Sequence, residues 1–168
     1  MDSANSSKSL AQVTADRDAS SNVPGRLLSL DLGTKRVGVA VCDELRITAN
    51  PLPLIERRNW KDLLRRVVEI VGKYDARGLI IGLPLNMDGS EGFAAIEARR
   101  LAENFRKSLH VPVYLQDERL TSIEAESQMR AAGDTEIDRR VDSESAAIIL
   151  RDFLEIHRAK HVSDPGKK

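Results

Sequence analysis

Four acidic residues stand at the ends of predicted secondary-structure elements, where carboxylates can carry out chemistry. Asp31 lies near the end of an apolar run, and Asp142 directly precedes a run with helical spacing. Asp117 and Glu118 directly follow a second apolar run. At an effective dielectric constant of about 20, two carboxylates about 4 Å apart repel by roughly 4 kcal/mol. Three such groups in contact must therefore take up protons or bind cations.

Bound cations would give this acidic group a hydrolytic chemistry. Carboxylate oxygens favour Mg²⁺ or Mn²⁺ over zinc, and neither Cys42 nor a nearby histidine supplies a softer ligand. Two such ions about 3.5 to 4 Å apart can activate a water and neutralise the leaving oxygen of a phosphodiester. The pattern thus indicates a metal-dependent nuclease, with Asp31, Glu118 and Asp142 as the candidate catalytic residues and metal ligands.

Taken one at a time, the acids also have plain structural explanations. Asp142 stands where a helix N-cap belongs, and aspartate is among the best N-caps. Asp117 and Glu118 could begin a loop and pair with Arg119. Asp31 is harder to explain in this way, because an unpaired charge within an apolar strand is costly. The metal-site hypothesis depends on the combination of the acids.

The hydrophobic pattern predicts the elements that would bring these acids together. Expected strands cover residues 26–32, 36–43, about 46–55, 78–84 and 111–116, and expected helices cover about 60–74, 91–109, 121–133 and 143–158. A three-strand meander followed by alternating helices and strands predicts one α/β domain, with a mixed sheet and helices on both of its faces. If strands one, four and five are parallel neighbours, Asp31 and Glu118 lie at one edge, where the last helix can add Asp142.

Composition and charge limit the class of protein. The 168 residues are 41% hydrophobic, enough for one domain with a core, and 26 basic residues balance 26 acidic ones. We expect a disordered tail over 1–24, the domain over 25–158 and a flexible tail over 159–168. No signal peptide or membrane span is evident, and the single cysteine excludes an internal disulfide, so a cytoplasmic location is expected.

Basic and polar residues near the acids are candidates for binding a polyanion. The candidates for nucleic-acid contacts are Lys35, Arg36, Arg119, Arg139, Arg140 and Asn86. Asn86 belongs to the segment 82–92, which begins and ends with glycine. This segment could be a mobile lid or touch the nucleic acid. Alternatively, it is a plain strand-to-helix connection with an Asp88–Gly89 turn. A second basic group over 57–66 is better explained as the solvated face of a helix.

Four segments in order resemble the YqgF family, also called RuvX: "LDLGTKRVGVAVCD", "GLPLNMDGSEG", "DERLTSIEA" and "VDSESAAIIL". The resemblance covers about residues 26–155. It implies a ribonuclease H-like fold related to Holliday junction resolvases, with Asp31, Glu118 and Asp142 at the three acidic positions of the nuclease site. It also implies a cation, Mg²⁺ or Mn²⁺, and a cytoplasmic bacterial nuclease that processes the 16S ribosomal RNA precursor in the pre-ribosome.

Two further residues take their expected roles from this resemblance. Asp117 is the adjacent alternative to Glu118 at its acidic position. The role expected for Asp117 is rather to contact the metal ligands without binding the metal, and the same role is expected for Ser145. Junction resolvases tend to carry a further acid one helical turn after the last one, where this chain has Ser145. This difference weakens the transfer of resolvase activity and favours a three-acid site.

Other functions stay open at this point. Branched DNA is an alternative substrate, and a non-catalytic protein that binds nucleic acid or assembling ribosomes is an alternative class. The segment "DLGTKRVG" also resembles the phosphate loop of actin-like and sugar-kinase ATPases. That superfamily closes its nucleotide between two domains, and one domain of this length supplies half of such a cleft. The oligomeric state is not predictable from these residues.

Overall fold

The computed structural model describes residues 25–119 and 135–162, and within the last helix it describes side chains over 143–158. The predicted N-terminal tail and the predicted helix over 121–133 lie outside these residues. The elements, in chain order, are β1 (Leu28–Leu32), β2 (Arg36–Cys42), β3 (Ala49–Glu56), α2 (Trp60–Tyr74), β4 (Leu79–Leu83), α3 (Phe93–Ser108), β5 (Val113–Asp117) and α5 (Thr135–Val162).

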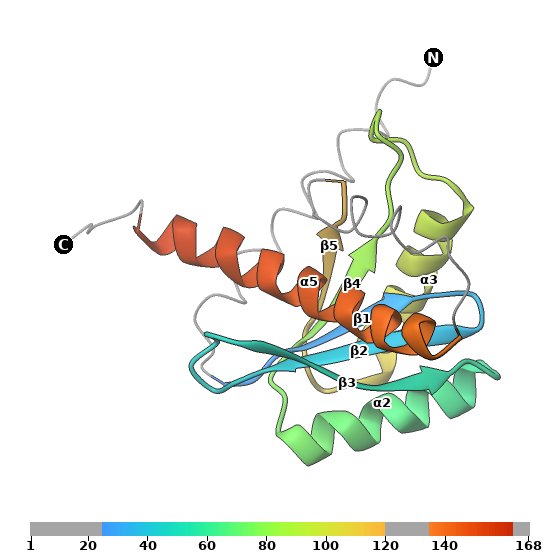
Figure 1. Ribbon diagram of the computed structural model, residues 1–168, viewed down its shortest axis with the longest axis horizontal. Helices are drawn as coiled ribbons and strands as arrows, with labels where there is room; N and C mark the ends of the chain where they lie inside the picture. Colours follow the sequence, from blue (N-terminus) through green and yellow to red (C-terminus); the bar gives the residue numbers. More distant parts are fainter. Residues whose placement is uncertain (1–24, 120–134, 163–168) are drawn as a thin grey trace.

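The five strands form one mixed sheet in the order β3-β2-β1-β4-β5 (Figure 1). Strands β1, β2 and β3 pair antiparallel as a meander, and β4 and β5 continue the sheet parallel to β1. This is the predicted five-stranded sheet of a ribonuclease H-like fold, and the prediction is confirmed. The carboxyl ends of β1, β4 and β5 therefore meet at one edge, as the site hypothesis requires.

Alternating side chains give the sheet two differently covered faces. Helices α2 and α3 pack on the face formed by Leu28 and Leu30 of β1 and the valines of β2. Helix α5 crosses the opposite face, where Ala40 and Cys42 of β2 contact its residues (Figure 1). The small side chains of β2 let the helix approach closely, because the face carries no bulk there.

The observed helix ends test the predicted caps. The Asn59 side chain accepts a 2.9 Å hydrogen bond from the Asp62 backbone N–H and so caps α2. The start predicted for the last helix, at residue 143, is wrong, because α5 begins at Thr135 and runs to Val162. Asp142 therefore lies within the helix and cannot be its N-cap. Few apolar residues mark the first two turns, so the periodic signal starts late.

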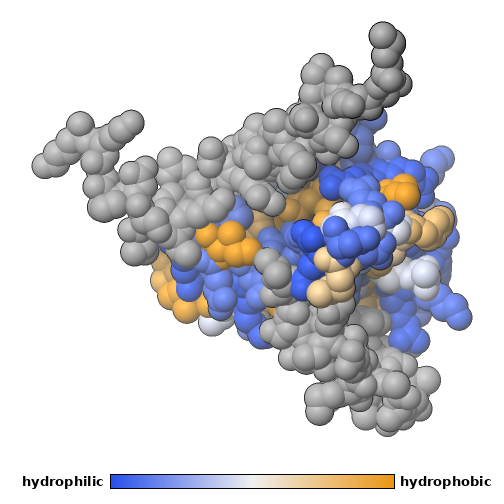
Figure 2. Space-filling model, turned by 90° about the horizontal axis from the view of Figure 1, so that it is seen from above, coloured by the Kyte–Doolittle hydropathy of each residue, from blue (hydrophilic) through white to orange (hydrophobic). Residues whose placement is uncertain are grey.

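Within residues 25–119 and 135–162, no helix combines the length and the apolar character that crossing a membrane requires. On the face seen in Figure 2, hydrophilic areas alternate with smaller hydrophobic ones. The large exposed apolar side chains are Leu45, Ile47, Val68, Met87, Phe93, Ile96 and Ile156.

Candidate active site

Asp31 lies on the face of the sheet that α5 covers. It is the penultimate residue of β1, and its position alternates with Leu30, which is buried on the opposite face. Two residues earlier on the same face, Ser29 is buried and donates a 2.6 Å hydrogen bond from its Oγ to the Ala146 carbonyl of α5. The half-buried Asp31 carboxylate thus stands at the carboxyl end of β1, beside the helix that carries Asp142.

Glu118 reaches across the neighbouring strand toward Asp31. It follows β5 directly, and its backbone N–H donates a 3.1 Å hydrogen bond to the Leu83 carbonyl of β4. Its carboxylate lies over Gly82 of β4, where an added Cβ would overlap Glu118 Oε1 and lie 2.7 Å from Ile149 Cδ1. Neighbouring strands are about 4.8 Å apart, so a side chain at position 82 would stand between the two acids. Glycine at this position makes the approach possible.

Gly82 is a residue of the candidate site that the sequence reasoning missed. Leu30 pairs with Ile81, so Asp31 and Gly82 stand at the next level of β1 and β4. On its other side, Gly82 pairs with Gln116 of β5. A signal was present in the sequence, because a glycine inside a buried apolar strand often marks a close approach of other groups.

The surroundings of Glu118 raise its pKa from 4.5 to about 8. Burial is the largest cause, followed by the negative charges of Asp31 and Asp117. The effect of Asp31 shows that the two carboxylates, which are far apart in the sequence, interact in the fold. The predicted meeting of Asp31 and Glu118 at one edge of the sheet is therefore observed.

Asp117 has a different partner. Its carboxylate accepts hydrogen bonds from Arg119 Nη2 at 2.7 Å and from Arg119 Nε at 3.0 Å, and it accepts another from the Arg119 backbone N–H at 2.9 Å. The pairing with Arg119 that the sequence offered as the plain explanation is thus observed for Asp117. Glu118 turns to Gly82 instead, so the two adjacent acids separate.

The remaining predicted residues of this group lie on α5. Asp142, Arg139 and Arg140 belong to the helix, but their side chains lie outside the described part. Ser145 is buried, one turn after Asp142 and next to Ala146. Among the described side chains, no group of three His, Cys, Asp or Glu residues could hold a metal ion. The position of the Asp142 carboxylate relative to the Asp31–Glu118 pair stays a prediction.

A tight turn after Asp31 presents Lys35. The Gly33 N–H donates a 2.9 Å hydrogen bond to the Arg36 carbonyl, and a Cβ at Gly33 would lie 2.5 Å from that oxygen. Arg57 braces this turn, because its Nη1 donates to the Gly33 carbonyl at 2.9 Å and its Nη2 pairs with Glu97 of α3. Lys35 is exposed in this turn, four residues after Asp31, and its contact to a phosphate stays a prediction.

Arg57 corrects the expectation of a solvated basic face over 57–66. Its side chain is 17% exposed, and it connects the β1–β2 turn to α3. Other arginines of that group do pair with neighbouring acids at the surface. Their partners are Glu56 for Arg58, Asp62 and Glu69 for Arg65, and Asp62 for Arg66.

The connection between β4 and α3 contains the predicted turn. The Gly89 N–H donates a 2.8 Å hydrogen bond to the Asn86 carbonyl, and Gly89 has a φ of +86°, which favours glycine. Asn86 Nδ2 donates to Ser90 Oγ at 2.9 Å, and Asp88 accepts from the same hydroxyl. The Asp88–Gly89 turn is therefore observed. The contact of the exposed Asn86 with nucleic acid stays a prediction.

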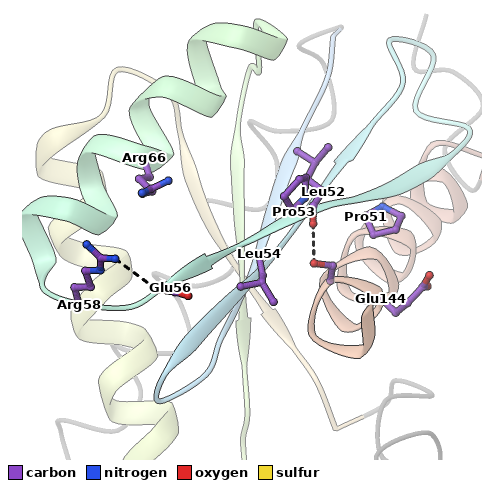
Figure 3. Close-up of a pocket in the computed structure, with 9 residues that line it drawn as sticks. Pro51, Leu52, Pro53, Leu54, Glu56, Arg58, Arg66 and Glu144 are labelled. Atoms are coloured by element: carbon purple, nitrogen blue, oxygen red, sulfur yellow. Dashed lines mark hydrogen bonds and ion pairs between the residues drawn. The ribbon is translucent and has the colours of Figure 1, made fainter. Parts of the chain in front are cut away.

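A separate groove of about 770 Å³ lies between β3, α2 and α5 (Figure 3). Its lining residues are Pro51, Leu52, Pro53, Leu54, Glu56, Arg58, Arg66, Ser143 and Glu144. Ser143 Oγ donates a 2.7 Å hydrogen bond to the Leu52 carbonyl and so joins α5 to the edge strand. The groove does not contain Asp31 or Glu118, and its two arginines are offset by two glutamates.

Comparison with known proteins places this geometry in a family. The family described as "RuvX: Holliday junction resolvase" matches residues 25–156. A protein of Anaeromyxobacter dehalogenans (strain 2CP-C), named "Putative pre-16S rRNA nuclease", is 45% identical over 132 residues, which are 77% of this chain and 96% of that protein. A protein of Syntrophus aciditrophicus (strain SB) with the same name is 39% identical over 142 residues, covering 83% of this chain and 95% of that protein.

Among solved structures, T. thermophilus RuvC in complex with a Holliday junction substrate is similar with a TM-score of 0.48 and 14% identity, covering 82% of this chain and 96% of that chain. The family match includes β1 with Asp31, β4 with Gly82 and β5 with the adjoining Glu118. It also includes the first 22 of the 28 residues of α5. This chain belongs to the RuvX family.

Proposed function

We propose that this protein is a metal-dependent nuclease that hydrolyses phosphodiester bonds in the precursor of 16S ribosomal RNA. One observation of the structure carries the proposal: the Glu118 carboxylate is held over Gly82, within electrostatic reach of Asp31. Membership of the RuvX family and the names of the relatives support the activity and the RNA substrate.

The donor set fits a hard divalent cation. Asp31 and Glu118 offer only carboxylate oxygens, which suit Mg²⁺ or Mn²⁺. Their mutual repulsion contributes to the raised pKa of Glu118, and a cation placed between them would remove this unfavourable interaction. We expect Asp31, Glu118 and Asp142 to hold the ion. When bound, it would supply activation of the attacking water and neutralisation of charge on the phosphate.

The chain's own residues orient the reacting groups. The Glu118 carboxylate lies between Gly82 of β4 and Ile149 of α5. This position limits its access to water. The braced turn after Asp31 holds Lys35 where it can neutralise a neighbouring phosphate. Arg36, Asn86, Arg139 and Arg140 are the other candidates for holding the substrate. These contacts are sequence-independent, so they suit a substrate recognised by its shape.

The experiment is cleavage of a 16S precursor fragment by the wild type and by Asp31→Asn in Mg²⁺ or Mn²⁺. We expect the wild type to cleave and a chelator to stop cleavage. We expect Asp31→Asn to lose cleavage while it still binds the RNA. Asp75→Asn is the matched control, because Asp75 lies at the end of α2 with a φ of 48°, which asparagine also tolerates. Full activity of Asp31→Asn would exclude the mechanism.

Junction DNA is the second candidate substrate, because the family is described by the name Holliday junction resolvase. A four-way DNA junction belongs in the same assay at the same metal concentration. Preferential cleavage of the precursor RNA supports ribosomal RNA processing, and preferential cleavage of the junction reverses that assignment. Binding of either substrate without cleavage by the wild type would instead indicate a non-catalytic binding protein.

A further inference from the structure

We propose that Arg119 is a positioning residue for the Glu118 carboxylate, rather than a contact to substrate phosphates. This role deepens the proposed nuclease function and rests on it. Sequence reasoning grouped Arg119 with the phosphate-binding candidates. The structure instead gives its guanidinium partners within the protein, on both sides of the segment that carries Glu118.

The first partner is Asp117. Arg119 Nε lies 3.2 Å from Asp117 Oδ1 and 3.0 Å from Oδ2, and Arg119 Nη2 lies 2.7 Å from Oδ2. The Arg119 backbone N–H adds a fourth contact to Oδ1 at 2.9 Å. The two side chains are only 31% and 25% exposed, so water screens this pair less than a surface pair. Residues 117 and 119 therefore form a closed unit around the backbone of Glu118.

The second partner is the turn after β4. A Cβ at Gly89 would lie 3.0 Å from Arg119 Nη1, so this nitrogen packs directly against the turn. Asp88, in the same turn, interacts electrostatically with the guanidinium. Arg119 thus connects the end of β5 to the β4–α3 connection. These two segments flank Gly82, over which the Glu118 carboxylate lies.

This arrangement keeps the Asp117 carboxylate away from the proposed cation site. Consecutive residues of a strand point to opposite faces, so Asp117 and Glu118 diverge. Without Arg119, Asp117 would lose the ion pair that holds its carboxylate on that face, and it could turn toward the cation that Glu118 is expected to hold. Arg119 holds Asp117 aside, so Glu118 remains the acid that lies over Gly82.

The test separates positioning from phosphate binding. Arg119→Ala is expected to lower kcat about 10- to 100-fold, the usual effect of removing a group that orients a metal ligand. The KM for RNA and the salt dependence of RNA binding in chelator should stay unchanged. Arg119→Lys keeps the charge but not the two-pronged geometry, so its kcat should be intermediate. The double variant Asp117→Asn/Arg119→Ala should recover at least about tenfold of the lost kcat, because the carboxylate that could compete with Glu118 is then gone.

Two control variants show the results expected for an exposed ion pair and for a phosphate contact. Arg77→Ala removes an arginine with the same spacing to its acid, since Arg77 Nη2 lies 2.9 Å from Asp75 Oδ2, but this pair is exposed and precedes β4. Its kcat should stay within about twofold of the wild type. Lys35→Ala removes an expected phosphate contact. The binding constant for RNA should then fall less steeply with salt, the slope of its logarithm against the logarithm of salt concentration being smaller in magnitude by about 0.7 to 0.9.

The inference would be overturned if Arg119→Ala kept its kcat and changed the salt dependence of RNA binding as much as Lys35→Ala. It would also be overturned if the double variant recovered none of the lost kcat. Failure of the proposed function is separately visible, as a wild type that does not cleave in any metal. The inference is then judged from Mg²⁺ titrations of the melting temperature. Arg119→Ala should need about 10- to 100-fold more Mg²⁺ than the wild type, and the double variant should restore the response. Equal responses of the wild type and Arg119→Ala, or no Mg²⁺ response at all, would overturn it.

Discussion

Replacing Glu118 by glutamine is expected to stabilise the metal-free protein at alkaline pH, although it removes one of the proposed catalytic carboxylates. Burial, with the charges of Asp31 and Asp117, raises the pKa of Glu118 from 4.5 to about 8. Between these values the folded protein keeps a proton that the unfolded chain has already released. The native state binds more protons there, so the free energy of unfolding falls as pH rises from about 4.5 to about 8.

The size of this effect follows from the two pKa values. Their difference, 8 − 4.5 = 3.5, at about 1.4 kcal/mol per pH unit, gives roughly 5 kcal/mol at pH 8 and above. Glu118 remains partly accessible to water, and solvent screening lowers the expected effect to about 2–3 kcal/mol. Glutamine keeps the shape of the side chain without the charge. Glu118→Gln should therefore match the wild type near pH 5 and exceed it by about 2–3 kcal/mol near pH 8.5.

Urea denaturation in EDTA at pH 5, 7 and 8.5 measures this difference. Glu103→Gln is the matched control, because the Glu103 side chain on α3 is 54% exposed and far from the acidic pair in the sequence. Its effect on the free energy of unfolding should be similar at all three pH values. If the wild type and Glu118→Gln unfold with the same pH dependence, Glu118 is not buried against Asp31, and the site geometry argued above is wrong.

Three further predictions test other parts of the structure. Gly82→Ala should abolish cleavage but retain the fold, because its Cβ would displace the Glu118 carboxylate. Gly72→Ala is the control, because nothing lies within 4 Å of a Cβ there; it should keep activity and gain about 0.5–1 kcal/mol of stability. Mg²⁺ should raise the melting temperature more at pH 8 than at pH 6, because the ligands must be deprotonated, and Asp31→Asn should lose this response. Arg57→Ala should lower the free energy of unfolding by about 2 kcal/mol in urea denaturation, because it leaves the largely buried Glu97 carboxylate with the longer, 3.8 Å pair to Arg100. Equal cleavage by both glycine variants, an undiminished Mg²⁺ response in Asp31→Asn or an unchanged stability of Arg57→Ala would contradict the corresponding step.

Much of the fold was predictable because its signals are local. The switch from alternating to helical periodicity located the strands and α2, and the prolines of β3 indicated its place at the edge of the sheet. The parallel neighbours β1, β4 and β5 followed from the order of strands and helices, and with them the meeting of Asp31 and Glu118. The start of α5 was missed, because an aspartate that resembles an N-cap outweighed two turns with few apolar residues.

The roles of the arginines could not be predicted from their positions in the chain. Arg57 and Arg119 both lie near predicted site segments, and a basic residue near acidic motifs suggests a phosphate contact or a solvated surface. Whether a guanidinium is available to a substrate depends on acids that the fold brings to it. Arg57 finds Glu97, 40 residues away on α3, whereas Arg119 finds Asp117, two residues away. Only the second partner is visible in the local sequence.

The chemical state of Glu118 depends on a glycine and on two other acids. Sequence alone identifies a carboxylate after a strand, and such a group at the protein surface is ordinarily ionised at neutral pH. Here the absent side chain of Gly82 lets the carboxylate approach Asp31, and Ile149 of α5 covers it from the helix side. Each contact disfavours the charged form, so the geometry that suits the proposed cation site also makes Glu118 costly to ionise without a cation. Stability and metal binding thus make opposite demands at this position. Glu118→Gln should therefore gain stability and lose metal binding.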